Sequence, residues 1–582
     1  MKRTKFLRIL LFVAAGLIVA RLFFIQIVEH DKYVALAEEQ QTMQYTILAE
    51  RGEIYMMDGI VGDKTAAVVM NEPVWTIIID PMLADEERTK EIIDKYAKEQ
   101  KVADWKDVFR DKNLRYYVVA RNVVRSAAEK IKAENLSGVW FQENVRRVYP
   151  EGQMASGVLG FVNADGEGQY GVEGALNEEL SGTNGLMKTV KDVNNIPLTI
   201  GDDNVRVPAE DGKNIVLTID RNIQKKVEKV LQSGMDKAGT KHASAVVMDP
   251  NTGKIWAMAN LPTYDATDYA KVEDASIFQN DPAQDAFEPA SVCKTFAFSA
   301  AIDSGAMTPD TTYENTGSTV VDGWPIENAY KGMYGTINMQ TALNYSLNTG
   351  STQALRLLGG NTSEITQVGK DKLYYYYHDL FGFGEYTGIE VPESDGIVIP
   401  SSNVDGTNAR YANMTFGQGM NITMVQTAAA FASVINGGEY YTPTLIEGEM
   451  KDGKLVKVDL KEPVRQTIST NTSATMRKML WGTRNHKRVS GVDRAGYFVG
   501  GKTGTSQAIR DGKYVMDETL ATYVGFGSAG NNESDAEMPE YVIMVKIWQE
   551  GKRIEGERDA APIFDELSNY LQDYLKIKPK GQ

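Results

Sequence analysis

Cysteine and histidine are scarce in this chain of 582 residues. Cys293 is the only cysteine, which excludes an internal disulfide and any zinc cluster built on cysteines. The four histidines, His30, His242, His378 and His486, are scattered and never form the H-E-x-x-H pair of a zincin-type site. Disulfide-stapled folds and these two kinds of zinc site are therefore ruled out.

Basic residues are too few to balance the acidic ones. The chain has 62 Lys and Arg against 78 Asp and Glu, a formal charge of −16. A nucleic-acid binder should carry a basic face, so we expect no nucleic-acid partner. Hydrophobic residues (42%) and charged residues (24%) are in the ordinary globular range, which argues against a fibrous or disordered chain.

A single long apolar run stands near the N-terminus. Residues 6–28 can cross about 30 Å of hydrocarbon as a helix, with Arg8 and Arg21 placed to reach the two interfaces. Basic residues precede the run and acidic residues follow it, so the positive-inside rule predicts a cytoplasmic N-terminus and an extracytoplasmic remainder. A cleaved signal peptide is the alternative, disfavoured because an A-x-A-like site is missing and the run is long.

Beyond the anchor, the pattern predicts a helix over 29–50 and a mixed α/β segment reaching about residue 235. Within that segment we expect strands at 67–70 and 74–79 and helices at 85–101 and 121–134.

The remaining sequence predicts a separate α+β domain. Residues 244–258 form a hairpin pattern, in which two apolar runs flank the turn residues Asp249–Gly253. Helical stretches follow over much of 291–440. The last expected elements are strands at 497–499, 521–526 and 541–547 and a helix at 561–575. Strands at both ends of a helical middle indicate one antiparallel sheet closed by distant segments.

One motif suggests nucleotide binding. Residues 496–503 match G-x-x-x-x-G-K-[ST], the phosphate-binding loop of NTPases. That loop requires a helix starting at its Lys-Thr pair, whereas the sequence here continues with Gly504-Thr505-Ser506, a poor helix start. The motif also falls on the extracytoplasmic side of the expected anchor, away from ATP. We therefore disfavour an NTPase.

A second motif suggests nucleophilic catalysis. Ser291-Val292-Cys293-Lys294 is the only S-x-x-K in the chain, and the apolar helix pattern after Pro289 places it in a first helical turn. Residues i and i+3 share a helix face, so Lys294 could accept the proton of the Ser291 hydroxyl. A capping serine followed by a surface lysine is the alternative for this motif alone.

Two further motifs are weaker when taken singly. S-x-N occurs three times, at 346–348, 401–403 and 469–471. Lys502-Thr503-Gly504 occurs once, at the end of a strand-like run, where the glycine permits a close approach by a ligand. An ordinary polar turn after a strand explains this tripeptide equally well.

Together the three motifs resemble the S-x-x-K, S-x-N and K-[ST]-G triplet of penicillin-binding proteins and serine β-lactamases. Spacing selects Ser346, which lies 55 residues after Ser291 and 156 residues before Lys502. Nearly the whole chain resembles the class B, monofunctional penicillin-binding proteins. The matching segments are 245–258, 288–294, 381–384 with 387–388, 417–419 with Thr423 and Gln426, and 501–505, together with Arg51-Gly52 and 171–173 with Leu180 and Gly182 upstream.

The chain departs from the family pattern at three places. Ala290 stands where the family usually has glycine, and Cys293 is unusual at its position. The pedestal motif R-G-x-I-x-D-R-x-G reads Arg51-Gly-Glu-Ile-Tyr-Met-Met-Asp-Gly59. Because Cys293 is two residues from Ser291 on a helix, and its neighbours are apolar, we expect it to be buried and to point away from the serine.

The resemblance implies a fold and a division of the chain. It predicts a membrane-anchored α+β protein, in which a mixed α/β pedestal precedes a domain with a five-stranded antiparallel sheet, flanking helices and an all-helical subdomain. The expected parts are a cytoplasmic tail (1–5), the anchor (6–28), a dimerisation-type pedestal (29–235), a transpeptidase domain (236–577) and a tail (578–582).

The resemblance also implies the chemistry of a peptidoglycan D,D-transpeptidase. Ser291 would form the acyl-enzyme, Lys294 would be its base and Ser346 would relay a proton to the leaving D-alanine. Asn348 would hold the substrate backbone. The terminal carboxylate would be recognised by Lys502, Thr503 and Thr505, with Gly504 beside them in the substrate-binding site, and the oxyanion would be bound by backbone N–H groups of Ser291 and Thr505.

The expected ligands are peptidoglycan stem peptides and β-lactams, and no metal or cofactor is implied. The expected partner is a membrane glycan polymerase of the SEDS family, docked on the pedestal. Two alternatives remain open, namely a D,D-carboxypeptidase or β-lactamase with the same machinery and a scaffold without catalysis.

Overall fold

The computed structural model describes residues 2–33, 42–60, 62–110, 115–190, 205–487, 493–510, 513–532, 534 and 536–581. The chain divides into two compact units. One comprises Met1–Gly52 with Glu178–Lys213, and the other comprises Glu53–Asn177 with Asn214–Gln582.

The first unit contains the expected apolar helix. Helix α1 (Lys2–Phe23) continues into a π-helical turn (Phe24–Val28). An 18-residue stretch within Arg3–Val28 has a mean hydropathy of 2.4, and no residue of that stretch is buried. One N-terminal apolar helix of this length fits a single membrane anchor. The unit also holds a three-stranded antiparallel sheet of β1 (Thr42–Ile47), β8 (Gly185–Val190) and β9 (Val205–Val207).

The helix predicted over 29–50 is wrong at its C-terminal end. Thr42–Ile47 forms strand β1 and pairs with β8 along its whole length. Its composition, T-M-Q-Y-T-I, alternates and is rich in β-branched and aromatic residues, and pairing with a segment more than 130 residues away decided the outcome. Residues 34–41 lie outside the described part of the chain.

The second unit begins with a mixed α/β region. Its seven-stranded sheet has the order β19-β18-β10-β2-β3-β4, with β5 also paired to β3. The strands are β2 (Ile54–Met57), β3 (Thr65–Ile79), β4 (Tyr117–Val124), β5 (Val139–Val148), β10 (Ile215–Asp220), β18 (Ile446–Lys451) and β19 (Lys454–Lys457). Helices α3 (Glu86–Tyr96) and α5 (Arg125–Ala133) bury their apolar faces against it.

Two sequence predictions in this region need correction. The two strands expected at 67–70 and 74–79 are one continuous strand, β3, which carries Pro73 in its interior. The helix expected over 121–134 begins only at Arg125, because residues 121–124 extend β4 and pair with β3. Shorter elements here are η2 (Lys98–Gln100), α4 (Trp105–Val108), α6 (Ser156–Leu159), β6 (Phe161–Val162), β7 (Gly168–Gln169), α7 (Gly171–Ala175) and α8 (Asn177–Ser181).

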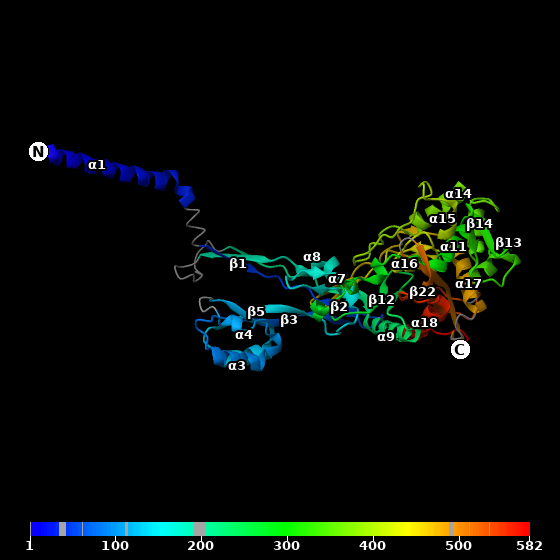
Figure 1. The fold of residues 1–582 in the computed structure, drawn as a ribbon, viewed down its shortest axis with the longest axis horizontal. Helices are drawn as coiled ribbons and strands as arrows, with labels where there is room; N and C mark the ends of the chain where they lie inside the picture. Colours follow the sequence, from blue (N-terminus) through cyan, green and yellow to red (C-terminus); the bar gives the residue numbers. More distant parts are fainter. Residues whose placement is uncertain are drawn as a thin grey trace. The chain divides into compact units, whose positions relative to one another are not determined.

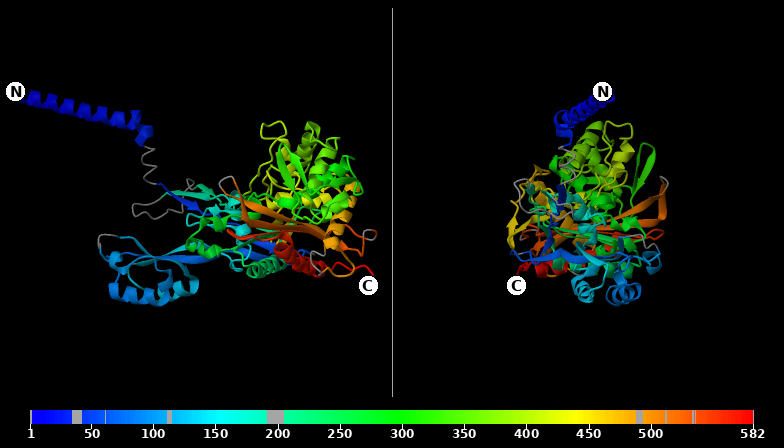
Figure 2. Two further views of the ribbon diagram at one scale, coloured as in Figure 1. Left: turned by 45° about the vertical axis from the view of Figure 1, so that its right-hand side comes forward. Right: turned by 90° about the vertical axis from the view of Figure 1, so that its left-hand side faces the viewer.

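The predicted antiparallel sheet is present in the second unit, with five strands in the order β12-β11-β23-β22-β21. These are β11 (His242–Met248), β12 (Ile255–Leu261), β21 (Tyr497–Arg510), β22 (Lys513–Ala529) and β23 (Tyr541–Trp548). The expected hairpin, the three C-terminal strands and the final helix are all confirmed. Figure 2 shows the long β21–β22 hairpin in orange. Strand β22 pairs with β23 only over Leu520–Gly527, whereas β21 and β22 stay paired as far as Arg510 and Lys513, so this end of the hairpin extends beyond β23.

Helices cover both faces of this sheet. Helices α9 (Arg221–Ala238) and α18 (Ala561–Tyr574) lie side by side (Figure 1) and pack Val227, Leu231 and Phe564 into the core beneath one face. Helix α16 (Met424–Ile435), buried at every residue, packs on β11 and β23 from the other side. The functional motifs lie where that helical layer meets β21.

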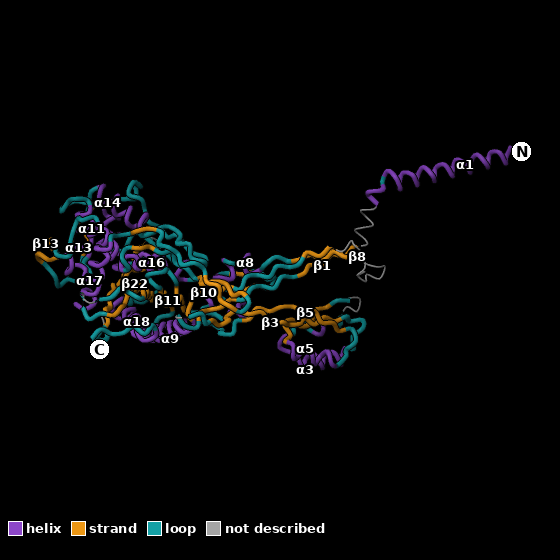
Figure 3. Tube along the Cα trace, turned by 180° about the vertical axis from the view of Figure 1, so that it is seen from behind, coloured by secondary structure: helices purple, strands orange, loops and turns teal. Residues whose placement is uncertain are grey.

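Most of the remaining helices contact one another and form the expected helical subdomain; Figure 3 draws these, like all helices, in purple. They are α11 (Lys294–Asp303), α12 (Met339–Asn344), α13 (Asn348–Leu358), α14 (Gln367–Tyr374), α15 (Asn408–Met414) and α17 (Thr470–Lys487), with the 3-10 turn η5 (Ala290–Cys293) and the π-helical turn η6 (Tyr375–Leu380). Outside this subdomain, α10 (Asp281–Gln284) packs on α16, the 3-10 turns η3 (Ala266–Lys271) and η4 (Ala275–Phe278) lie against β6 and α6, and the π-helical turn η7 (Gly556–Ala560) packs on α18 and β22.

The helical stretch expected over 291–440 also contains two small hairpins. They pair β13 (Thr312–Asn315) with β16 (Gly335–Asn338) and β14 (Ser318–Val321) with β15 (Trp324–Glu327). The turn of the second is Asp322-Gly323, and both residues have a positive φ, as a tight two-residue hairpin turn requires. Two-stranded pairing also joins β17 (Glu439–Tyr440) to β20 (Arg465–Gln466).

Candidate active site

Ser291 sits on a tight turn at the start of a buried helix. The turn η5 is 3-10 in geometry and runs directly into α11 at Lys294. Ala290, just before the serine, has a φ of +58° and donates its N–H to the Gly417 carbonyl at 3.1 Å. A left-handed residue disfavours any side chain, which explains the family's preference for glycine at this position.

Lys294 connects the first two motifs. Its side chain is completely buried, and its Nζ lies 2.8 Å from Ser291 Oγ, 3.1 Å from Ser346 Oγ and 2.8 Å from Asn348 Oδ1. A fourth contact, at 2.8 Å, is to the backbone oxygen of Ser346. The structure therefore brings the S-x-x-K motif and the first S-x-N motif together around one amine.

Ser346 and Asn348 stand between α12 and α13. Ser346 has a φ of +54°, so it is a second strained backbone position in these motifs, after Ala290. Asn348 begins α13 and donates its Nδ2 to the Glu327 carbonyl at 2.9 Å. The other two S-x-N motifs have unrelated contacts, since Ser401 bonds to Asp371 and Ser469 to Asp303 and Thr472.

The K-T-G motif lies on edge strand β21. Lys502, with 1% of its surface exposed, donates to Ser346 Oγ at 2.9 Å and to the Thr503 carbonyl at 3.0 Å. Thr503 is half-buried and Thr505 is exposed, and residues two apart on a strand face the same side. The Thr505 hydroxyl accepts the Gly556 N–H at 3.0 Å.

Gly504 allows β21 to approach the serine turn. A Cβ at this position would stand 2.9 Å from the Pro289 carbonyl oxygen and would collide with the Thr522 hydroxyl. The residues predicted for catalysis and substrate binding thus lie on η5, the start of α11, the α12–α13 junction and β21, and Lys294 and Lys502 both contact the Ser346 hydroxyl there. The same strand removes the NTPase alternative, because β21 continues through Lys502 and Thr503 where a phosphate-binding loop needs a helix.

Sequence reasoning gave no role to Glu288, three residues before the serine. Its side chain is 8% exposed, and Oε1 accepts the Gly419 N–H at 2.7 Å and the Tyr514 hydroxyl at 3.0 Å. Within the part of the chain that the structure describes, its buried Oε2 has no hydrogen-bond partner, and burial raises the pKa of this carboxyl. The only sequence feature that could have singled out Glu288 is its position in segment 288–294, one of the segments that resemble the class B penicillin-binding proteins.

Cys293 is completely buried, as expected. Burial raises the pKa of its thiol far above the ordinary range, so the thiolate is suppressed. Its backbone carbonyl accepts the Tyr377 hydroxyl at 3.4 Å. A cysteine nucleophile or redox switch is therefore not supported.

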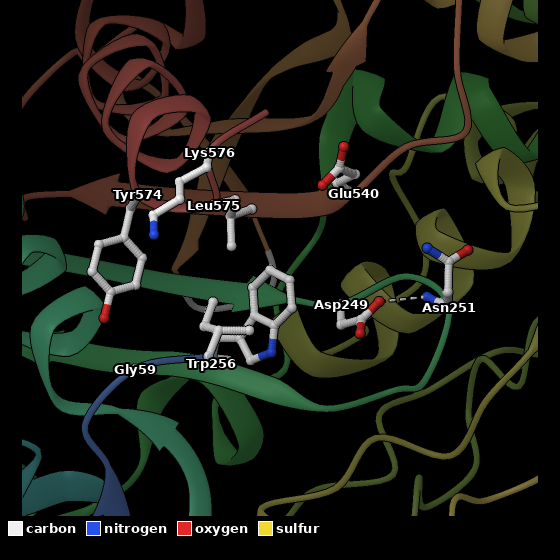
Figure 4. Close-up of a pocket in the computed structure, with 9 residues that line it drawn as sticks. Gly59, Asp249, Asn251, Trp256, Glu540, Tyr574, Leu575 and Lys576 are labelled. Carbon is white, nitrogen blue, oxygen red and sulfur yellow. Dashed lines mark hydrogen bonds between the residues drawn. The ribbon is translucent and has the colours of Figure 1, made fainter. Parts of the chain in front are cut away.

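A cavity of about 670 Å³ lies elsewhere in the second unit (Figure 4). Trp256 and Tyr574 provide aromatic surface there, with Asp249, Glu540 and Lys576 around them. None of the residues predicted for catalysis lines it, so its size alone does not make it the active site.

Comparisons with known proteins agree with this geometry. Residues 243–569 match the model of the penicillin-binding protein transpeptidase domain, and residues 46–217 match that of the penicillin-binding protein dimerisation domain. The fold and site define a serine-type penicillin-binding transpeptidase. The chain belongs to the class B penicillin-binding proteins, in which both domains occur together, and it is a peptidoglycan D,D-transpeptidase.

Its relatives span most of its length. It is 30% identical to stage V sporulation protein D of Bacillus subtilis, over 99% of this chain and 87% of that protein. It is 26% identical to the probable peptidoglycan D,D-transpeptidase PenA of Neisseria gonorrhoeae, over 87% of this chain and 84% of that one. The crystal structure of penicillin-binding protein 3 from Mycobacterium tuberculosis, complexed with ampicillin, superposes with a TM-score of 0.66 at 22% identity, covering 92% of this chain and 98% of that one.

Proposed function

We propose that Ser291, Lys294 and Ser346 carry the transpeptidase reaction through an acyl-enzyme on Ser291. The observation that carries the proposal is the position of Lys294 Nζ, buried and within 3.1 Å of both serine hydroxyls. Burial and the nearby ammonium of Lys502 both disfavour a second charge, which favours the neutral amine that a base requires.

In the first half-reaction, Ser291 Oγ attacks the carbonyl that joins the two terminal D-alanines of a stem peptide. Lys294 takes the hydroxyl proton as the new C–O bond forms, and backbone N–H groups of Ser291 and Thr505 stabilise the oxyanion. The C–N bond then breaks, and Ser346 passes a proton from Lys294 to the leaving amine. Free D-alanine and an ester on Ser291 are the products.

In the second half-reaction, the amine of another stem peptide attacks the ester carbonyl. The new C–N bond forms, the C–O bond to Ser291 breaks, and the proton lost by the amine returns to the serine through Lys294. The result is a cross-linked dimer and a free Ser291. Asn348, already fixed between Lys294 and Glu327, is placed to hold the donor peptide backbone.

The same strand that positions Lys502 supplies the carboxylate site. Lys502 contributes positive charge, and Thr503 and Thr505 present hydroxyls on one side of β21, beside Gly504. A β-lactam carries a reactive amide and a carboxylate in a similar arrangement, so we propose that β-lactams acylate Ser291. The ampicillin complex of the mycobacterial penicillin-binding protein 3 supports this.

We also propose the orientation and the partner implied by the sequence. The N-terminus lies in the cytoplasm, and the catalytic unit lies outside the membrane, where peptidoglycan is assembled. The pedestal docks on a SEDS-family glycan polymerase. Protease accessibility in spheroplasts tests the orientation, and co-purification with such a polymerase tests the docking.

Product analysis tests the function directly. Full-length protein in detergent, supplied with uncross-linked stem-pentapeptide substrate, should yield cross-linked dimers and free D-alanine. Trimmed monomers alone would identify a hydrolase. Ser346→Ala should lower the yield at least a hundredfold, whereas Ser401→Ala, the matched change in another S-x-N motif, should leave it unchanged.

A further inference from the structure

Three large aromatic side chains are exposed in the segment that leads to Ser346. Trp324 is 70% exposed, Tyr330 is 45% exposed and Tyr334 is 60% exposed. We call these three residues the aromatic rim. Exposed aromatic groups gathered in one short segment are unusual on a protein surface and often mark binding sites.

The backbone under the aromatic rim is firmly anchored. Val321 and Ile326, on the β14–β15 hairpin, are buried against Ala412 and Phe416. At the hairpin turn, the Asp322 carboxylate accepts the Ala409 N–H at 2.9 Å. Trp324 is therefore exposed on a fixed hairpin, and its exposure does not come from a loose loop.

Hydrogen bonds also connect the segment that carries the aromatic rim to the S-x-N motif. The Glu327 carbonyl, at the end of β15, accepts a hydrogen bond from Asn348. Asn328, next to it and only 1% exposed, accepts the Thr349 N–H at 3.0 Å. The Tyr330 ring lies 4.9 Å from that of Tyr345, which immediately precedes Ser346.

The length of the β14–β15 hairpin separates Tyr334 from Trp324 and so determines the length of the aromatic rim. Tyr334 packs over Gly317, at the base of β14, since a Cβ there would stand 2.7 Å from its ring. Trp324 follows the turn at the other end of the hairpin, about four residues or ~13 Å away at strand rise. Glu327 and Lys331 neutralise each other in an ion pair of 2.6 Å, so the base of the aromatic rim has little net charge.

We propose that the aromatic rim binds the disaccharide of the glycan strand that carries the donor stem peptide. A pyranose ring has faces of C–H groups and an edge of hydroxyls, which suit the apolar faces and polar tips of Trp and Tyr. Four stem residues separate the scissile bond from the sugar and span up to ~14 Å. A sugar tethered to a peptide at Ser291 and Asn348 can therefore reach the hairpin.

This proposal rests on the proposed function, because it requires donor peptide at Ser291. It assigns the enzyme a preference for stem peptides that are still attached to glycan. A free peptide would use only the catalytic motifs, and a penicillin would use neither the sugar site nor the distal stem.

The test compares three acylating agents on the full-length protein. They are a synthetic disaccharide-pentapeptide, the same pentapeptide without sugar, and benzylpenicillin. We expect Trp324→Ala to lower the second-order rate of Ser291 acylation by the disaccharide-pentapeptide about tenfold, and to leave the other two rates within twofold. Tyr334→Ala should act in the same direction, and Trp324→Phe should restore most of the rate.

Trp140→Ala is the matched control, because Trp140 is an exposed tryptophan (46%) on β5, away from the catalytic motifs. Equal loss for both peptides, or no loss for either, would overturn the sugar site while leaving Ser291 acylation intact. A wild-type protein with no preference for the sugar-bearing peptide would overturn it too. Absence of acylation by all three agents would instead overturn the proposed function.

Discussion

Lys502 donates a hydrogen bond from Nζ to Ser346 Oγ at 2.9 Å, across 156 residues of sequence. The contact joins edge strand β21 to the α12–α13 junction and so closes the site between the sheet and the helical layer. Lys294 Nζ lies 3.1 Å from the same oxygen. One serine hydroxyl between two buried amines is suited to moving a proton.

The first prediction concerns the turn before the serine. Ala290→Gly should stabilise the protein by about 0.5–1 kcal/mol, because glycine adopts a φ of +58° without a steric penalty. Ala297→Gly, in the interior of α11, is the control and should destabilise by about 1 kcal/mol or more. Denaturant unfolding measures both, and a less stable Ala290→Gly protein would contradict the strain argument.

The second prediction concerns the cysteine. Cys293→Ala should retain most penicillin acylation and should cost about 1–2 kcal/mol of stability through the small cavity it leaves. The native thiol should react with a maleimide only after unfolding, since burial both shields it and raises its pKa. Fast labelling of the folded protein with parallel loss of acylation would make Cys293 part of the site.

The third prediction concerns pH. Burial raises the pKa of Glu288, so the folded state holds this proton more tightly than the unfolded state does. The resulting stabilisation is complete below the unfolded pKa, near 4.5, and is lost as pH rises through the higher folded value. Glu288→Gln, which can still accept both hydrogen bonds, lacks this titration.

The melting temperature of Glu288→Gln should therefore rise relative to that of the wild type between pH 4 and pH 8. Thermal unfolding at several pH values measures the difference. Glu557→Gln, at an exposed position, is the matched control for replacing a carboxyl by an amide. A melting temperature of Glu288→Gln that falls relative to the wild type over this pH range would show that the folded protein stabilises the ionised Glu288 carboxylate.

The fourth prediction concerns the anchor. Removing residues 1–28 should give a water-soluble protein that acylates with penicillin at an unchanged rate, because the apolar span ends at Val28 and the residues proposed for catalysis belong to the other unit. Sedimentation shows whether the truncated protein separates from the membranes, and penicillin labelling measures its rate of acylation. A truncated protein that stays with the membranes would reveal another lipid-contacting surface.

Much of the site could be predicted from the sequence because its key pair is local. Ser291 and Lys294 are three residues apart, so helix geometry alone predicted their contact. Ser346 was different, since three S-x-N motifs were equivalent until family spacing selected one. The Glu288–Tyr514 bond spans 226 residues and depends on where the β21–β22 hairpin lies, so no local pattern could predict it.

In the fold, too, features with a local sequence signal were predicted and features that depend on distant segments were not. The hairpin over 244–258 carries strong turn chemistry and was predicted correctly. The β13–β16 and β14–β15 pairs are only four residues long per strand, too short for an alternating pattern to stand out within a helical stretch. Strand β1 owes its state to pairing with β8, which is a tertiary effect.

The most direct test of the central claim is the mass of the intact protein after exposure to benzylpenicillin. The account predicts a gain of one penicilloyl group, located on the peptide that contains Ser291. Ser291→Ala should gain nothing while keeping the wild-type melting temperature to within a few degrees. A folded Ser291→Ala protein that still acquires the adduct, or a wild-type adduct on any other residue, would contradict the assignment of Ser291 as the nucleophile.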